Sequence, residues 1–463
     1  MSSVPGVEKR RRTLKLGVLS GVGWAGMAGL TQNYITPFAL ELKASAFQIG
    51  LLTSVPNITM ALSQLFTPNL TQRMGSRKRT TLMAIFIDAL TWLPIMLIPF
   101  IFKQQAVWFL LMFFAIKGIG GNLGSPAWSS MMAELVPQGV RGRYFSWRGT
   151  LVNGAMLIFS FIAMGIMEYF KTRDIFVGFS ILFGGAALFR LLSAVLFSRM
   201  YEPPMPREEK AGSRWRTVLR LGSTDFGRFT IVMSVFMFAL NLGAPFSAVF
   251  LYRDLKFDFL PYIVVMTAGS AFMVVFAPFW GRRSERVGNA KIIRLVLLAT
   301  PIGPILWLFS SNVAYLVAIQ VMNAFFGAGL NLAMNNYIMD EARREEVTRN
   351  MAIFNTFFGA AACLGALIGG VLASRLPPVF GYSLKTLFLL QGALLFAVAA
   401  IGYRKIREVR RVAQISMVNL LLGKFPGPTE KRSARSDYGF RILPEMSDEE
   451  LSDKNGKNER RPQ

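Results

Sequence analysis

Three ionisable residues stand inside long apolar stretches and are the best candidates for chemistry in this chain: Asp88, Lys117 and Arg190. A charge in the hydrocarbon core of a membrane costs about 2.5–3.5 kcal/mol on insertion scales, so each of them needs a partner or a function. The sequence has no histidine and a single cysteine, Cys363. A proton relay would therefore have to use a carboxylate or a lysine. We expect no disulfide, no metal site and no cofactor.

Asp88 and Arg190 are predicted to form an intramembrane ion pair. Asp88 lies eight residues after the start of the apolar stretch 80–102, and Arg190 lies eight residues before the end of 175–198. At the rise of a helix both side chains would be about 12 Å deep. Equal depth and opposite charge favour a pair that serves folding. The alternative is that Asp88 binds a transported proton.

Lys117 lies deeper, ten residues into the stretch 107–134, which corresponds to about 15 Å and places it near the midplane. Trp128 shares its face of the predicted helix. Lys117 could attract an anionic group of a substrate, exchange a proton during coupling, or only pair with a neighbouring helix. At an offset of 206 residues its counterpart is Asn323, with Asn331 on the same side.

Twelve apolar stretches must position these residues. The chain of 463 residues is 53% hydrophobic and 17% charged, and stretches of 18 or more apolar residues are long enough to cross a membrane. They are continuous rather than alternating, so they predict helices instead of barrel strands. We therefore expect an all-α membrane protein with twelve transmembrane helices, at 17–40, 46–70, 80–102, 107–134, 150–167, 175–198, 229–252, 260–280, 292–310, 313–338, 352–373 and 384–403.

The chain repeats itself at about half its length. Phe66–Arg79 (FTPNLTQRMGSRKR) returns 213 residues later as Phe279–Lys291 (FWGRRSERVGNAK), which places Arg73 on Arg286 and Gly75 on Gly288. A turn that recurs with its spacing indicates two copies of one six-helix unit. The predicted parts are an N-terminal tail (1–16), a first bundle (17–200), a linker (201–228), a second bundle (229–405) and a partly disordered tail (406–463).

The basic residues indicate the orientation. Most of the 51 Lys and Arg residues fall in the two tails and in the loops on the same side as the N-terminus. The positive-inside rule then predicts that both termini are cytoplasmic in a multi-pass protein of the inner membrane. The net charge of +25 follows from this topology, and we expect the lipid bilayer, not nucleic acid, as the partner.

Two repeated halves with a basic turn after the second and the eighth span resemble the major facilitator superfamily. The second turn fits that family's loop motif well, through Gly281, Glu285, Arg286, Gly288 and Lys291, whereas the first has Pro68 and Gln72 in place of a glycine and an acid. The resemblance implies a central cavity lined by spans one, four, seven and ten. Candidate cavity residues are Lys117, Trp128, Asn323 and Asn331, together with polar residues before prolines in spans one and seven: Asn33, Tyr34 and Asn241.

The resemblance also implies a cytoplasmic gate built from charged turns. In the first half, Arg73 and Gly75 are expected near Glu134 and Arg143. In the second half, Gly281, Glu285, Arg286 and Gly288 are expected near Asp340 and Arg349, which follow Glu134 and Arg143 at an offset of 206. The missing acid at Gln72 predicts that the first network is the weaker one. Alternatively, these loops are basic only because they are cytoplasmic.

The predicted function is secondary active transport of a small solute by alternating access, by a monomer, with ion or proton coupling or facilitated diffusion left open. No nucleotide-binding loop of the form G-x-x-x-x-G-K-[ST] is present, so ATP does not drive it. The alternatives are a non-transporting sensor or scaffold on the same fold and a membrane-embedded enzyme. The enzyme is disfavoured because only Asp88 and Lys117 could serve as catalytic groups.

Overall fold

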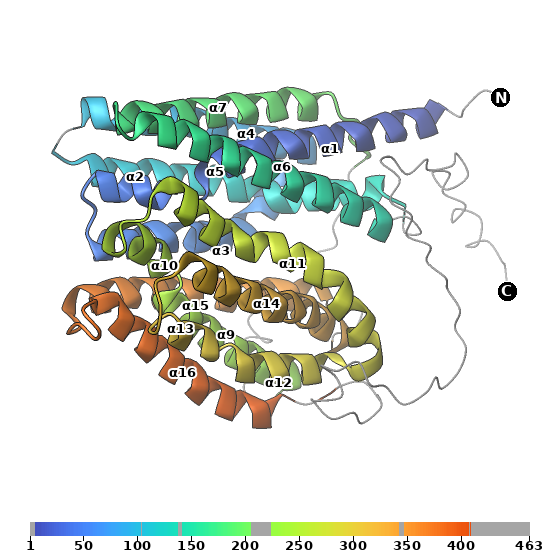
Figure 1. Cartoon of the computed structure of the whole chain (residues 1–463). Helices are drawn as coiled ribbons and strands as arrows, with labels where there is room; N and C mark the ends of the chain where they lie inside the picture. The colour runs from blue at the N-terminus through green and yellow to red at the C-terminus, as the bar shows by residue number, and fades with distance from the viewer. Residues whose placement is uncertain are drawn as a thin grey trace.

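The computed structural model describes residues 5–102, 104–137, 141–204, 224–341, 347–406 and 408. Most of the predicted linker and nearly all of the predicted C-terminal tail lie outside these residues. The described chain is almost entirely helical, with one isolated bridge between Val379 and Tyr382. Figure 1 shows two helical bundles, the first in blue to green and the second in yellow to red.

The first bundle contains the first half of the sequence. Its helices are α1 (Pro5–Thr31), α2 (Ile35–Glu41), α3 (Ala46–Met74), α4 (Arg77–Ile101), α5 (Ala106–Leu135), α6 (Arg141–Phe170) and α7 (Ile175–Ser198). Within it, α4 packs on α5 and α7, while α1 packs on α6 and α7. The sequence predicted these spans to within a few residues, with two exceptions: α1 begins twelve residues before the predicted start at 17, and α6 begins nine residues before the predicted start at 150.

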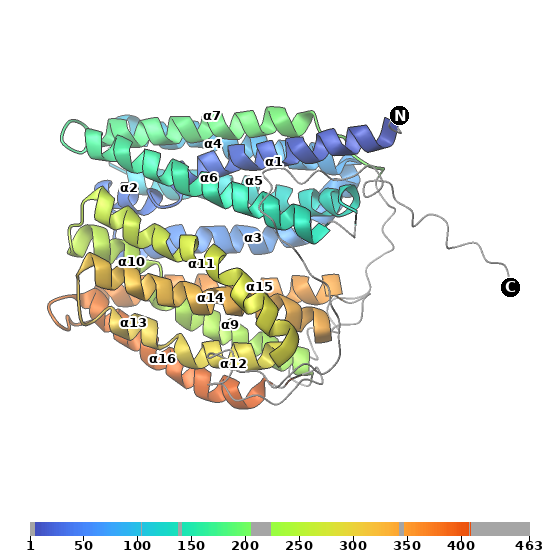
Figure 2. The ribbon, with the colours of Figure 1, turned by 45° about the vertical axis from the view of Figure 1, so that its right-hand side comes forward.

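The second bundle repeats this arrangement. Its elements are α9 (Asp225–Gly243), α10 (Phe246–Val249), the π-helix η2 (Phe250–Asp254), α11 (Phe259–Val287), α12 (Asn289–Ala299), α13 (Ile302–Leu306), α14 (Val313–Glu341), α15 (Val347–Arg375) and α16 (Ser383–Lys405). The bundles meet where α3 packs on α15 and where α6 packs on α11; in Figure 2, α3 and α11 lie where the two bundles face each other.

The described residues include ten helical segments that are long and apolar enough to cross a membrane. The protein is therefore a multi-pass membrane protein, as predicted. The two other long helices, α1 and α3, carry more polar residues: α1 opens on a basic run, and α3 contains amides and hydroxyls along its length. That all twelve spans cross the membrane stays a prediction.

Prolines interrupt two of the predicted spans. The first breaks into α1 and α2 just before Pro37, and the seventh breaks at Pro245 before α10. Proline has no N–H and its ring crowds the carbonyl four residues earlier, which is that of Asn33 in the first span. The Asn33 carbonyl instead accepts a hydrogen bond from the Tyr262 hydroxyl in the other bundle (2.7 Å). The break in the helix thus provides a contact between the halves.

The repeat extends to backbone conformation. Gly75 and Gly288 end α3 and α11 with positive φ angles of 62° and 91°. Lys43 and Lys256, which follow the first and the seventh span at the same offset of 213, have φ angles of 64° and 52°. A side chain is disfavoured in this region, so its recurrence at matched lysines indicates a turn that both halves need.

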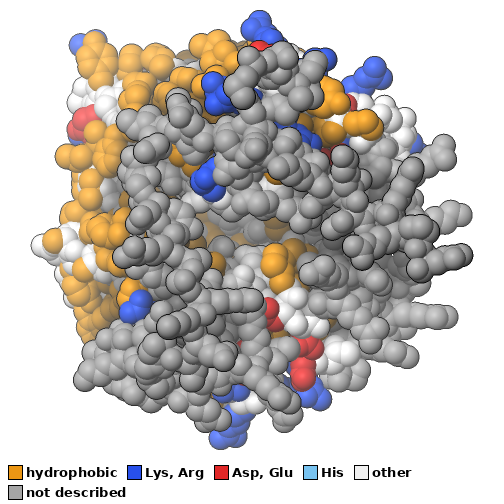
Figure 3. Space-filling model, turned by 90° about the vertical axis from the view of Figure 1, so that its right-hand side faces the viewer, with side chains coloured by type: hydrophobic (Ala, Val, Ile, Leu, Met, Phe, Trp, Pro, Cys, Tyr) orange, Lys and Arg blue, Asp and Glu red, His pale blue; other side chains and the backbone are white. Residues whose placement is uncertain are grey.

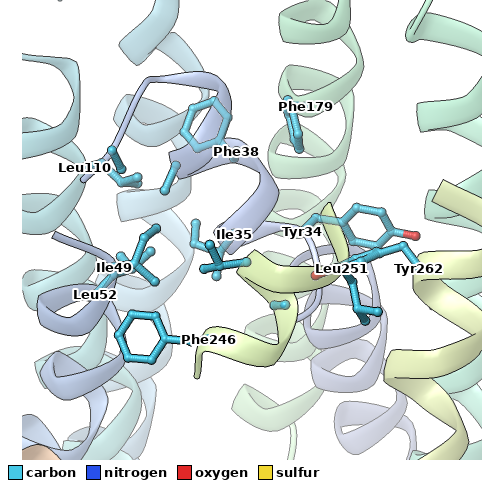
Figure 4. Close-up of a cluster of buried hydrophobic side chains, with 14 of the residues drawn as sticks. Tyr34, Ile35, Phe38, Ile49, Leu52, Leu110, Phe179, Phe246, Leu251 and Tyr262 are labelled. Atoms are coloured by element: carbon cyan, nitrogen blue, oxygen red, sulfur yellow. The ribbon is translucent and has the colours of Figure 1, made fainter. Parts of the chain in front are cut away.

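The hydrophobic core differs between the two ends of the molecule. At the end where α2 and η2 lie, a single buried cluster contains residues of both bundles, among them Tyr34, Phe38, Phe246 and Tyr262. Figure 4 shows these side chains interleaved. At the other end the described residues form two separate clusters, one around Trp280 in the second bundle and one around Met131 in the first. The halves thus share a buried hydrophobic core at one end only.

Replacing Gly369 by alanine should destabilise the second bundle, because an added Cβ would lie 2.0 Å from the carbonyl oxygen of Leu242 in α9. Overpacking of this kind costs about 1–3 kcal/mol. The buried Cys363 thiol reports unfolding through its reaction with a thiol-specific fluorophore on heating. Gly327→Ala is the matched control, since nothing lies within 4 Å of its added Cβ. Equal melting temperatures for both variants would contradict the tight α9–α15 contact.

Candidate functional site

The first bundle lines an open cavity of about 770 Å³. Its described lining comes from α1 to α7 and carries four charged residues: Asp88, Lys117, Arg148 and Arg190. Trp24, Trp92, Phe114 and Trp128 add aromatic surface. A concave site with mostly apolar walls and a few convergent polar groups is the usual form of a small-molecule site.

Asp88 lies between two cations. Arg190 Nε donates a hydrogen bond to Asp88 Oδ2 (2.6 Å), and Lys117 Nζ lies 3.6 Å from Oδ1. The Asp88 side chain is only 2% exposed. The expected contact between Asp88 and Arg190 is thus present. However, Lys117 belongs to the same cluster, and the cluster lines the cavity. The predicted ion pair is therefore present, and Lys117 is a third member of the cluster that the sequence did not predict.

Small residues bring the helices of this cluster together. A Cβ on Gly120 of α5 would lie 2.7 Å from Ile87 Cγ2 and 3.0 Å from the Asp88 nitrogen of α4. On the other side, Ser20 of α1 and Ser193 of α7 exchange hydrogen bonds of about 3 Å between hydroxyls and carbonyls. These close approaches, and not loops, set where the three charges lie.

Lys117 is held over aromatic rings and faces the cavity. Its Nζ lies 5.0 Å from the centre of the Trp92 ring and 5.4 Å from that of Phe114. Cation–π contacts stabilise an ammonium group without neutralising it. The Lys117 side chain keeps 20% of its surface exposed, compared with 9% for Arg190. Lys117 is therefore the member of the cluster most accessible from the cavity.

Arg148 is a cavity residue that sequence reasoning missed. Its guanidinium stacks over Trp128 with 4.6 Å to the ring centre, and its Nε donates to the Gly17 carbonyl (3.4 Å). A Cβ on Gly21 would lie 2.8 Å from its Nη2, so the glycine leaves room for the side chain. The sequence assigned Arg148 to a cytoplasmic loop because the apolar run begins only at Thr150. In the structure, α6 already starts at Arg141, so Arg148 belongs to the helix and not to a loop.

The predicted cavity residues of the second bundle lie elsewhere. Asn323 is adjacent to Gly303 and donates weakly to Gln320 (3.5 Å), while Asn331 accepts a hydrogen bond from Asn335. Asn241 donates to the Met237 carbonyl of its own helix. None of these three predicted residues is among the described residues that line the cavity.

Two predicted cavity residues of the first span make hydrogen bonds to α6 and are not among the described residues that line the cavity. Asn33 donates to Ser160 Oγ (3.2 Å), and the Tyr34 hydroxyl donates to the Ser160 carbonyl (2.8 Å). Tyr34 is fully buried in the core that the bundles share. Trp128 and Lys117 do line the cavity, as predicted.

The predicted gate in the first half uses a different arginine. Glu134 is bound by Arg77, with Nη1 and Nη2 at 2.8 and 2.9 Å from its two oxygens. Arg73, the expected partner, lies exposed at the end of α3. The prediction of an Arg73–Glu134 contact was therefore wrong. The αL turn at Gly75 ends α3 and lets α4 begin at Arg77, which places that arginine against α5.

In each bundle, a carboxylate that follows the last helix accepts hydrogen bonds at the N-terminus of the third span, which is α4 in the first bundle and α12 in the second. Glu202 accepts from Ser76 Oγ and the Arg77 nitrogen, both at 2.6 Å. Glu408, 206 residues later, accepts from the Ala290 nitrogen (2.9 Å) at the start of α12. An anion at a helix N-terminus satisfies free N–H groups and the helix dipole. The sequence contained a signal for this pair of carboxylates, because Glu202 and Glu408 are separated by the same 206 residues as Glu134 and Asp340.

The remaining predicted gate residues belong mostly to the second bundle. Asp340 accepts a hydrogen bond from Asn289 Nδ2 (2.7 Å), so the second network uses an amide where the first uses Arg77. Gly288 connects α11 to α12, and Gly281 lies within α11. Arg143 is exposed near the start of α6. The side chains of Glu285, Arg286 and Arg349 lie outside the described part of the chain.

Three polar contacts between the bundles lie at the opposite end, in addition to the hydrogen bond from Ser54 of α3 to the Cys363 carbonyl of α15 (3.1 Å). Besides the Tyr262–Asn33 hydrogen bond, the Tyr252 hydroxyl donates to Glu41 Oε1 (2.8 Å). Lys171 bridges to Asp258 (3.0 Å). We name these three contacts the clasp; they lie beside the core that the two bundles share.

The fold and the cavity define a class: a multi-pass helical membrane protein of two similar bundles, with a polar cavity in the first of them. The chain belongs to the major facilitator superfamily, because that family's sequence pattern matches residues 16–263 and again 227–437. Among curated proteins, it is 26% identical over 137 residues to a multidrug resistance protein, MdtG, of Yersinia enterocolitica, covering 30% of this chain and 31% of that protein. It is 24% identical over 138 residues to the class H tetracycline resistance protein of Pasteurella multocida, covering 29% and 34%.

These two matches span about a third of each relative. Solved structures match over a longer range: a nucleoside transporter, NupG, has a TM-score of 0.65 at 13% identity, covering 86% of this chain and 99% of that one. A D-xylose–proton symporter has a TM-score of 0.65 at 14% identity, covering 89% and 100%. At such identities the likeness supports the fold alone, and it is the fold that the sequence predicted.

Proposed function

We propose that the protein is a secondary active transporter that moves a small solute across the membrane by alternating access. The observation that carries this proposal is the asymmetry of the core: the bundles share one core beside the clasp and have separate cores at the other end. Two bodies that share a core at one end can rock against each other and expose the cavity of the first bundle to either side of the membrane. Membership of the superfamily supports the same activity.

The orientation we propose places both termini in the cytoplasm, in the inner membrane. Figure 3 looks onto the end where α1 begins, and Lys and Arg side chains stand out on its described surface. Basic residues favour the cytoplasmic side. The clasp is then external, and the structure corresponds to an inward-facing state. A monomer suffices for this mechanism, and a proton or another cation could supply the coupling.

The two cytoplasmic networks act as a gate in this proposal. In the inward-facing state each network lies within its own bundle, Arg77 with Glu134 in the first and Asn289 with Asp340 in the second. Closure of the cytoplasmic side would bring the two networks towards each other. The first network is then the stronger of the two, because Arg77 forms an ion pair with Glu134. The absence of an acid at Gln72 predicted the opposite, that the first network is the weaker one.

Reversing the charge of Lys171 should open the external side. Its ammonium donates to Glu168 and to Asp258, and these hydrogen bonds raise the pKa of Lys171 above its ordinary value. A raised lysine pKa means that the bridge is fully present below the ordinary lysine value and is lost only as the pH rises through the higher folded one. At neutral pH, Lys171→Glu therefore replaces attraction with repulsion.

The measurement uses a single reporter thiol, Ser125→Cys in the cavity, in a Cys363→Ala background. A membrane-impermeant thiol reagent is applied in separate experiments to the external or to the cytoplasmic side of oriented vesicles. If access alternates, the reagent should label this cysteine in both experiments. Lys171→Glu should accelerate external labelling by about two- to fivefold, a range typical of exposed ion pairs. The charge swap Lys171→Glu with Asp258→Lys should reverse the effect.

The control variant is Arg375→Glu, which changes an exposed charge at the end of α15 outside the clasp. It should leave external labelling unchanged. If the reporter is labelled from one side only in every variant, alternating access is refuted, and a non-transporting sensor on the same fold would account for the family match.

A further inference from the structure

We propose that the substrate is an organic anion with an aromatic or otherwise apolar body, bound in the cavity of the first bundle by Lys117, Arg190 and Arg148. This inference rests on the proposed transport function and specifies its substrate class. It stands on the charge balance of the cavity, on donors left without acceptors, and on the nature of the walls.

The charges that line the cavity do not cancel. Three cations face it, and Asp88 is the only carboxylate among its described lining residues. Asp88 is engaged by both Arg190 and Lys117, while Arg148 contacts no carboxylate in the described part of the chain. Buried charge is costly unless it is compensated. A bound anion with one or two negative charges would balance the excess.

The donors of the cluster are available for a ligand. Arg190 uses only Nε to bind Asp88, and its two terminal amino groups donate no hydrogen bond within the described residues. Lys117 Nζ, at 3.6 Å from Asp88, is beyond hydrogen-bond distance. A planar guanidinium beside an ammonium group suits a carboxylate, sulfonate or phosphate group, because both supply charged N–H donors.

The walls suit an apolar body on the same molecule. Trp24 and Trp128 line the cavity with their rings, and Trp92 and Phe114 lie beneath Lys117. Aromatic side chains stack on flat apolar ligands and also hold cations near them. A small inorganic anion would leave this surface unused. A cationic ligand would meet three like charges, and a neutral one would leave the excess charge unbalanced.

The test compares matched ligands on the purified full-length protein. Benzoate and phenylphosphate are the anionic probes; benzamide and benzylamine are the neutral and cationic controls of similar shape. Binding is read from the thermal unfolding midpoint and from quenching of tryptophan fluorescence. We expect the anions to bind at least tenfold more tightly than benzamide, and benzylamine to bind more weakly than benzamide.

The variants locate the site. Lys117→Met and Arg148→Gln should each weaken benzoate binding by about tenfold, as is typical for the loss of a charged hydrogen bond, while Arg375→Gln, which removes an exposed charge outside the cavity, should leave it unchanged. Arg148→Gln carries the test if Lys117→Met fails to fold, because Arg148 contacts no carboxylate among the described residues.

Equal binding of benzamide and benzoate, or benzoate binding unchanged in Arg148→Gln, would overturn the anion site. The anion site would also be overturned if neither anion bound while the Ser125→Cys reporter was still labelled from both sides. That result would leave the transport proposal standing. Conversely, anion binding that both variants weaken, with labelling from one side only, would support the anion site and refute transport.

Discussion

Arg77→Met is expected to lower the free energy of unfolding of the first bundle by about 3 kcal/mol, near the lower end for breaking a buried ion pair. Arg77 is 2% exposed and binds both oxygens of Glu134, the carbonyl of Pro203 (3.0 Å) and Ser130 Oγ (3.2 Å). Its loss would leave Glu134 without its cation. Glu134 is 33% exposed, so hydration offsets part of the cost.

The measurement for Arg77→Met is the thermal unfolding midpoint in detergent, followed by tryptophan fluorescence. Arg77→Lys keeps the charge but not the two parallel hydrogen bonds, so it should lose less stability. Arg73→Met is the matched control from the same turn; because Arg73 is exposed, a change of less than about 0.5 kcal/mol is expected. A larger loss in Arg73→Met than in Arg77→Met would restore the arrangement that the sequence alone predicted.

Asp88→Asn should be at least as damaging, by about 3–5 kcal/mol, because it leaves two cations in a bundle interior without a counter-charge. The double variant Asp88→Leu with Arg190→Met should recover much of this loss, since an apolar pair of similar volume replaces a buried ion pair at little cost. Lys117 then keeps only its contacts with Trp92 and Phe114.

The unfolding free energies of the wild type, Asp88→Leu, Arg190→Met and the double variant form a thermodynamic cycle that isolates the coupling between Asp88 and Arg190. Formate should also raise the midpoint of Asp88→Ala, because the space left by the side chain fits one carboxyl group. An Asp88→Asn protein as stable as the wild type would show that the pair contributes nothing to folding.

The sequence predicted the fold from features that act at short range. Continuous apolar runs of sufficient length require helices in a membrane, whatever their neighbours are. The repeated turns at Gly75 and Gly288 require a particular backbone angle, so they are visible as residue types at a fixed spacing. The depth of Asp88 and Arg190 along their helices was sufficient to predict their contact.

What the sequence missed depends on which helices approach each other. Arg148 lies before an apolar run, and only the packing of α6 against α1 places it beside Trp128 and Gly17. Likewise, Arg73 and Arg77 lie in the same basic turn; the direction in which α4 leaves Gly75 selects Arg77 for Glu134. Asn323 matched Lys117 by offset, but its side chain packs at Gly303 within the second bundle.

By itself, the sequence determined a helical membrane protein of two repeated halves with three charged residues inside its spans, since helix length, period and turn chemistry are local properties. The tertiary structure alone decided that Lys117, Asp88 and Arg190 form one cluster, that Arg148 faces the same cavity, and that the bundles share a hydrophobic core at one end. Those facts depend on glycines such as Gly120 that allow helices from distant parts of the chain to approach closely, and helical periodicity carries no information about such approaches.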